Sequence, residues 1–112
     1  MSKKYKYNYR PEYSSENLLI EFISGVDNET FEKDLFEAIN QINPNIVKKE
    51  DLWMNDEILY TVNSNIGDFE LSKNTILDLV FITSKENKLI INKIDELLIK
   101  DDRFEKLESS LK

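Results

Sequence analysis

Three apolar runs in the second half of the chain constrain the fold more than any other feature of the sequence. They occupy residues 58–62, 69–71 and 76–83, and the last run is the most apolar. Residues 63–68 and 72–74 separate the runs and are rich in Asn, Ser, Asp and Gly, which favour turns. Strand-like runs joined by short turns predict an antiparallel meander. We expect the most apolar run to form its central strand.

Asp78 interrupts this most apolar run. A charge in a buried central strand is costly unless it is paired. We therefore expect Asp78 to face the solvent side of the sheet, or to meet a basic group on a partner.

The N-terminal segment also shows strand periodicity. Residues 3–9 alternate polar and aromatic side chains, a period of two that favours a strand. We interpret this segment as an edge strand with Tyr5, Tyr7 and Tyr9 on the core and with lysines outside, where they discourage unwanted pairing. Residues 46–53 predict a weaker strand.

Helical periodicity marks two further segments. Residues 31–42 place apolar side chains on one face of a helix, which Pro44 ends. Residues 89–98 carry a broad apolar stripe after a capping-box pattern at 83–86. A second such pattern at 102–105 predicts a short last helix.

Residues 17–24 fit two structures. Leu18, Phe22 and Val26 follow one another at helical spacing, and a glycine that could end a helix precedes Val26. The alternation of Leu18, Ile20 and Phe22 also fits a strand. We favour the helix and keep the strand as the alternative.

Together these segments predict one α+β domain over residues 1–112. In this domain a small, mostly antiparallel sheet of about four or five strands packs against helices. The expected order is β-α-α-β-β-β-β-α-α. A chain of 112 residues with 40% hydrophobic residues can form a core without disulfides.

The composition excludes most catalytic chemistry. The chain has no Cys and no His, so it lacks a thiolate nucleophile, an imidazole base and a cysteine zinc site. Its two glycines form no phosphate-binding loop. Asp68 and Glu70 are compatible with one oxygen-ligated cation, and equally with a solvated sheet edge. We expect no enzyme, no cofactor and no metal.

The charge is acidic and unevenly spread. Asp and Glu number 22 against 15 Lys and Arg, a net charge of −7. Residues 16–37 hold seven acidic residues and one lysine, a sum of −6. Glu29 and Glu32 fall where a helix dipole stabilises carboxylates, so this segment has a structural as well as a functional interpretation.

A second acidic segment surrounds the only tryptophan. Residues 50–57 hold four carboxylates and no base, with Trp53 in the middle. Tryptophan is favoured at the centre of interfaces, but in a small domain it is also a core residue. We nominate nine residues from the acidic segments for partner binding: Glu29, Glu32, Glu50, Asp51, Trp53, Asp56, Glu57, Asp68 and Glu70.

A small, cysteine-free, acidic α+β chain with an aromatic residue in an acidic loop resembles the immunity proteins of bacterial toxin–immunity pairs, including those of contact-dependent growth inhibition. The resemblance is one of general character across the chain and includes no motif, so no residue role is carried over. It implies a cognate toxin domain, often a basic nuclease, that is held inactive by binding. Opposite charge would speed that association.

These observations predict a binding protein that neutralises a basic protein partner. A net-acidic chain is a poor candidate for nucleic-acid binding. The sequence shows no secretory signal and no apolar run of membrane-spanning length, so we expect a cytoplasmic protein that binds no membrane. The alternative is a structural or regulatory subunit without a toxin partner. That subunit would be a homodimer joined through the stripe at 89–98, a phage or mobile-element protein, or a mimic of DNA.

Overall fold

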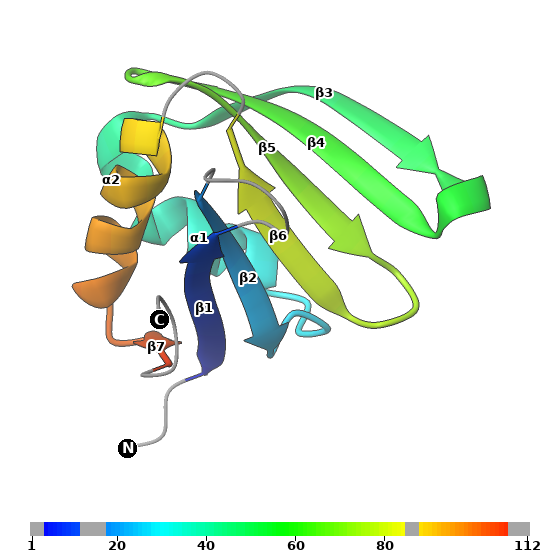
Figure 1. Cartoon of the computed structure of the whole chain (residues 1–112), viewed down its shortest axis with the longest axis horizontal. Coiled ribbons are helices and arrows are strands. Elements are labelled where there is room, and N and C mark those ends of the chain that lie inside the picture. Colours follow the sequence, from blue (N-terminus) through cyan, green and yellow to red (C-terminus); the bar gives the residue numbers. More distant parts are fainter. Residues whose placement is uncertain (1–3, 12–17, 85–87, 108–112) are drawn as a thin grey trace.

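The computed structural model describes residues 4–11, 18–84 and 88–107 (Figure 1). Within these ranges it contains seven strands, two α-helices and two short 3-10 helices. In chain order they are β1 (Tyr5–Pro11), β2 (Leu18–Ser24), α1 (Phe31–Ala38), η1 (Asn40–Ile42), β3 (Asn45–Leu52), η2 (Trp53–Asn55), β4 (Glu57–Ser64), β5 (Gly67–Asn74), β6 (Leu79–Thr83), α2 (Lys88–Ile99) and β7 (Phe104–Lys106).

All seven strands belong to one mixed sheet in the order β3-β4-β5-β6-β2-β1-β7. The pair β1 and β7 is parallel, and the other neighbours are antiparallel. The predicted meander is confirmed as β4, β5 and β6, and β6 lies in the middle of the sheet. The predicted count of four or five strands is wrong, because two segments interpreted as helices are strands.

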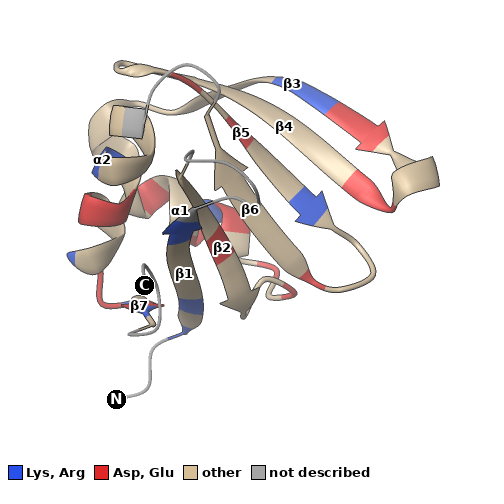
Figure 2. Ribbon diagram, in the orientation of Figure 1, with Lys and Arg blue, Asp and Glu red and all other residues tan. Residues whose placement is uncertain are grey.

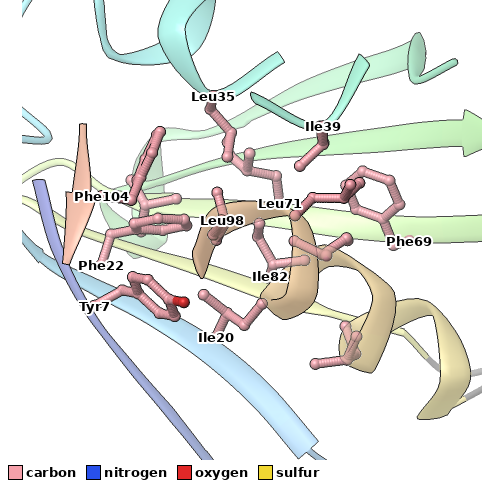
Figure 3. Close-up of a cluster of buried hydrophobic side chains, with 14 of the residues drawn as sticks. Tyr7, Ile20, Phe22, Leu35, Ile39, Phe69, Leu71, Ile82, Leu98 and Phe104 are labelled. Atoms are coloured by element: carbon pink, nitrogen blue, oxygen red, sulfur yellow. The ribbon is translucent and has the colours of Figure 1, made fainter. Parts of the chain in front are cut away.

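Both helices cover the same face of the sheet. Ile20, Ile82, Leu71 and Tyr60 follow one another in register across four neighbouring strands and are buried on this face. Leu35 of α1 and Leu98 of α2, both fully buried, pack onto the same cluster (Figure 3). Each such side chain contributes about 1.5–3 kcal/mol when it is removed from water.

Two buried carboxylates tie the helices to β1. Tyr5 donates a hydrogen bond from its hydroxyl to Asp34 of α1 at 2.6 Å. Tyr7 donates in the same way to Asp95 of α2 at 2.9 Å. The predicted orientation of the tyrosines toward the core is confirmed.

Residues 18–24 form strand β2, so the favoured helix is wrong and the alternative is correct. The strand lies between β1 and β6 and buries residues on both of its faces: Ile20 and Phe22 on one, Leu19 on the other. Leu19 and Ile23 on the second face are apolar too, although Ile23 is exposed, so the sequence of the strand is nearly continuously apolar and imitates a helical stripe.

The predicted last helix is also wrong, because residues 104–106 form β7, parallel to β1. Asp101 rather than Asp102 organises this segment. Its carboxylate accepts a hydrogen bond from the backbone N–H of Arg103 at 2.9 Å, which forms a tight turn. Because β7 pairs with β1, the predicted edge position of β1 is wrong.

The boundary between β5 and β6 differs from the prediction. Residues 72–74 belong to β5, and the turn comes later, at 75–78. Asp78 therefore lies in a turn and not in the central strand. Residues 31–42 divide into α1 and η1 before Pro44. Part of the capping box expected at 83–86 lies outside the described residues.

Candidate functional site

One end of the sheet projects beyond both helices, and two turns meet at this end (Figure 1). The first connects β3 to β4 through η2, and the second connects β5 to β6. The backbone carbonyl of Asp56 accepts hydrogen bonds from the N–H and the hydroxyl of Thr75, at 2.9 and 3.1 Å. We call this end, made of residues 50–57 and 74–78, the tip.

Short polar residues give the tip its backbone shape. Asp56 and Asp78 have positive φ angles of 54° and 52°, in a region that Asp tolerates better than most residues. The side-chain oxygen of Asn74 accepts hydrogen bonds from the N–H groups of Ile76 and Leu77, at 3.0 and 2.8 Å. These bonds fix the second turn so that its apolar side chains stay outside the core.

Large apolar side chains gather on the tip. The exposed fractions are 75% for Trp53, 80% for Met54, 66% for Ile76 and 65% for Leu77. A single exposed apolar residue is ordinary, but a group of this kind marks an interaction site. Tryptophan and methionine are also enriched in interfaces.

Carboxylates lie on the same two segments of the chain as these apolar side chains. The tip carries five of them and no Lys or Arg, a local charge of −5. Figure 2 shows acidic residues where β3 ends and β4 begins. They are Glu50, Asp51, Asp56, Glu57 and Asp78.

Two of the five carboxylates have internal partners. Glu50 lies 3.4 Å from the ammonium of Lys48, and Glu57 accepts a hydrogen bond from the Ser72 hydroxyl. None of the described basic residues forms an ion pair with Asp51, Asp56 or Asp78. These three are exposed and available to an external cation.

The structure brings five of the nine nominated residues together at the tip and separates the other four. Asp68 lies near the opposite end of β5, where its carboxylate accepts a hydrogen bond from Asn63 at 2.6 Å. Glu70 lies in the middle of that strand. Glu29 precedes α1 and is exposed.

Glu32 lies on α1 and has a structural contact. It accepts a hydrogen bond from the Tyr60 hydroxyl at 2.9 Å. Burial of Tyr60, together with this hydrogen bond, raises the pKa of its hydroxyl to about 12. Glu32 therefore connects α1 to β4.

Much of the charge on the acidic segment at 16–37 is compensated inside the protein. Arg10 pairs with Glu21 at 3.0 Å, and Arg103 pairs with Asp34 at 3.1 Å and with Glu37 at 2.9 Å. The hydrogen bond from the Tyr5 hydroxyl is the main cause that lowers the pKa of Asp34. Three described carboxylates of this segment are thus paired inside the protein, whereas Asp51, Asp56 and Asp78 of the tip form no ion pair with a described lysine or arginine.

The apolar stripe of α2 is used within the core. Ile90, Ile91, Ile94 and Leu98 are at most 1% exposed. Leu89 and Ile99 at the two ends of the helix remain outside. The homodimer expected through this stripe would therefore have little apolar surface from α2.

The described residues include no group of three acidic side chains that could hold a metal ion. Asp68 and Glu70 share the open face of the sheet, two residues apart on β5. In the described ranges no helix has the length and apolar character needed to cross a membrane.

Ile76 and Leu77 were not among the predicted site residues, because in the sequence they belong to the apolar run that predicts a strand. The signal that could have placed them in a turn is Asn74. Its side chain competes for the backbone N–H groups that follow it.

Comparison with known protein families, with curated proteins and with solved structures finds no match for this chain.

Proposed function

We propose that this chain is a binding protein that neutralises a basic protein partner in the cytoplasm. Most concretely, it is an immunity protein that blocks the active site or substrate groove of a cognate toxin domain, such as a nuclease. The observation that carries the proposal is the tip. Exposed Trp53, Met54, Ile76 and Leu77 lie there among carboxylates that the described lysines and arginines leave largely uncompensated.

The chemistry of such a groove matches the tip. A nuclease binds phosphates with clustered lysines and arginines. Carboxylates on the tip would attract that surface and speed association. The exposed indole of Trp53 would supply the buried anchor from which interfaces gain most of their affinity. Because the tip projects beyond the helices, it can enter a groove without displacing the core.

The test is calorimetric titration of the chain against a basic nuclease toxin domain at several salt concentrations. We expect Trp53→Ser to weaken binding by about 2 kcal/mol or more, since interface tryptophans reach that range. Asp56→Asn should weaken binding and flatten its dependence on salt. Trp53 and Asp56 are exposed, and asparagine tolerates the positive φ of position 56 as aspartate does, so neither change should alter the unfolding midpoint.

Matched controls lie on the far side of the molecule. Ile99→Ser removes an exposed apolar side chain from the end of α2, and Asp102→Asn removes an exposed charge near β7. Neither control should change binding. Unaltered affinity and salt dependence in the two tip variants would overturn the proposal.

A further inference from the structure

Strand β3 forms one edge of the sheet, and no described strand pairs with its outer side. A β-bulge between Ile46 and Lys48 interrupts the register of β3 with β4. From Lys48 to Leu52 the backbone N–H and C=O groups that point away from β4 have no described strand beside them, which makes this part of the edge a template for another strand. None of its eight side chains is buried.

The side chains of β3 divide into complementary halves. Apolar Ile46 and Val47 precede Lys48 and Lys49, and the acidic residues 50 and 51 follow before apolar Leu52. In an antiparallel pair of two such strands, Lys48 of each copy can lie beside Glu50 of the other. An edge lysine normally discourages pairing. Here the second copy brings a carboxylate to Lys48, while Lys49 lies beside its own copy.

We propose that β3 pairs with β3 of a second copy, antiparallel, about a two-fold axis at Lys49. Such an axis requires one residue to face its own copy, because a two-fold interface is self-complementary. With Lys49 at the axis, Lys48 of each copy faces Glu50 of the other. Within one chain these two side chains already lie 3.4 Å apart on the open face. Lys48 and Glu50 of the two copies therefore form a square in which positive and negative side chains alternate.

On the other face of the strand the Lys49 side chains of the two copies lie side by side at the axis, and neighbouring groups offset their repulsion. The ammonium of Lys49 lies 5.6 Å from the centre of the Tyr60 ring of its own chain, which stabilises the cation. Asp51 is on the same face, two residues away, and flanks both lysines. Centring the axis on Glu50 would instead place two carboxylates against each other.

This pairing leaves part of the tip accessible. The β5–β6 turn lies two strands away from the edge, so Ile76 and Leu77 stay outside the pairing. Antiparallel pairing also places the two tips at opposite ends of the shared edge. The dimer thus presents two separate sites to basic partners.

The test is the molar mass of the purified chain, measured by light scattering and sedimentation over a wide range of protein concentrations. We expect a concentration-dependent dimer. Lys48→Glu makes the square entirely acidic and Glu50→Lys makes it entirely basic. Each should weaken dimerisation roughly tenfold or more, since cross-strand attraction becomes repulsion.

An equimolar mixture of the two variants distinguishes this geometry from a loss of folding. In the mixture each acidic pair faces a basic pair, so a heterodimer should form although neither variant dimerises alone. The double change Lys48→Glu with Glu50→Lys should likewise restore the homodimer. A chain that is monomeric at all concentrations, or a mixture that stays monomeric, would overturn the proposal. Toxin binding is measured separately and can fail or succeed on its own.

Discussion

At the scale of single residues, the buried hydroxyl of Tyr7 has a measurable role. It donates to Asp95, which is only 6% exposed and which also accepts a charged hydrogen bond from Lys106 at 3.0 Å. We expect Tyr7→Phe to destabilise the fold by about 1–3 kcal/mol in urea unfolding, because a buried acceptor loses its donor. Tyr9→Phe is the control, since Tyr9 has no hydroxyl partner among the described residues. Equal effects of the two changes would contradict this account.

Gly25 is the second residue with a specific requirement. Its φ of 85° is unfavourable for other residues, and an added Cβ would lie 2.5 Å from the backbone carbonyl oxygen of Lys4. We expect Gly25→Ala to lower the free energy of unfolding by at least about 1 kcal/mol, from backbone strain and from the clash with β1. Thermal unfolding measures the loss, and a midpoint equal to that of the unchanged chain would refute the predicted clash.

Residue types were more predictable than residue partners. The alternation at 3–9 correctly placed the tyrosines on the core. The carboxylates that accept their hydrogen bonds lie 29 and 88 positions further along the chain, a distance that no local pattern spans. The sequence also nominated Trp53 as either a core residue or a contact residue, and only the structure shows that it is exposed.

At the scale of elements, local patterns predicted the parts of the sheet whose strands are neighbours in sequence. The β4–β6 meander follows from runs and turns that lie side by side. Strand β7 was missed because its three residues gain their structure from β1, almost a hundred positions earlier. Strand β2 was misinterpreted because it carries apolar residues on both faces, including Leu19 and Ile23, which removed the alternation that identifies a strand.

Arg103 holds β7 in place and provides a prediction at this scale. Its guanidinium pairs with Asp34 of α1 at 3.1 Å and with Asp101 at 2.8 Å. We expect Arg103→Leu to cost about 1–3 kcal/mol, since Asp34 keeps only part of its compensation, and to increase amide exchange in β7. Lys100→Leu removes an exposed pair with Glu96 and should change stability by less than about 0.5 kcal/mol. Similar losses in both variants would contradict the proposed anchoring role.

At the scale of the whole molecule, the distribution of charge matters more than its sum. The net charge is −7, but basic residues near the two ends of the chain neutralise α1. No local pattern pairs Lys4 or Arg103 with residues of that helix, which lie far from both in the chain. The sequence did identify residues 50–57, where acidic neighbours have no base between them.

The pH dependence of stability follows from the same contacts. Hydrogen bonds from Tyr5 and Arg103 lower the pKa of Asp34 and of Asp101 respectively. Stability from these carboxylates should be complete above their unfolded pKa of about 3.9 and should disappear as the pH falls through the lower folded values.

In alkaline solution the stability of the fold should change with pH in the opposite direction. Burial, together with the hydrogen bond to Glu32, raises the pKa of Tyr60 from 10.0 to about 12, so the folded chain retains a proton that the unfolded chain releases. Stability from Tyr60 should be complete below pH 10.0 and should decrease as the pH approaches about 12. Urea unfolding of Tyr60→Phe across this interval should show a smaller decrease than the unchanged chain, and Lys100→Leu should show the same decrease as that chain. If Tyr60→Phe loses stability as steeply as the unchanged chain, Tyr60 is not the group that retains the proton.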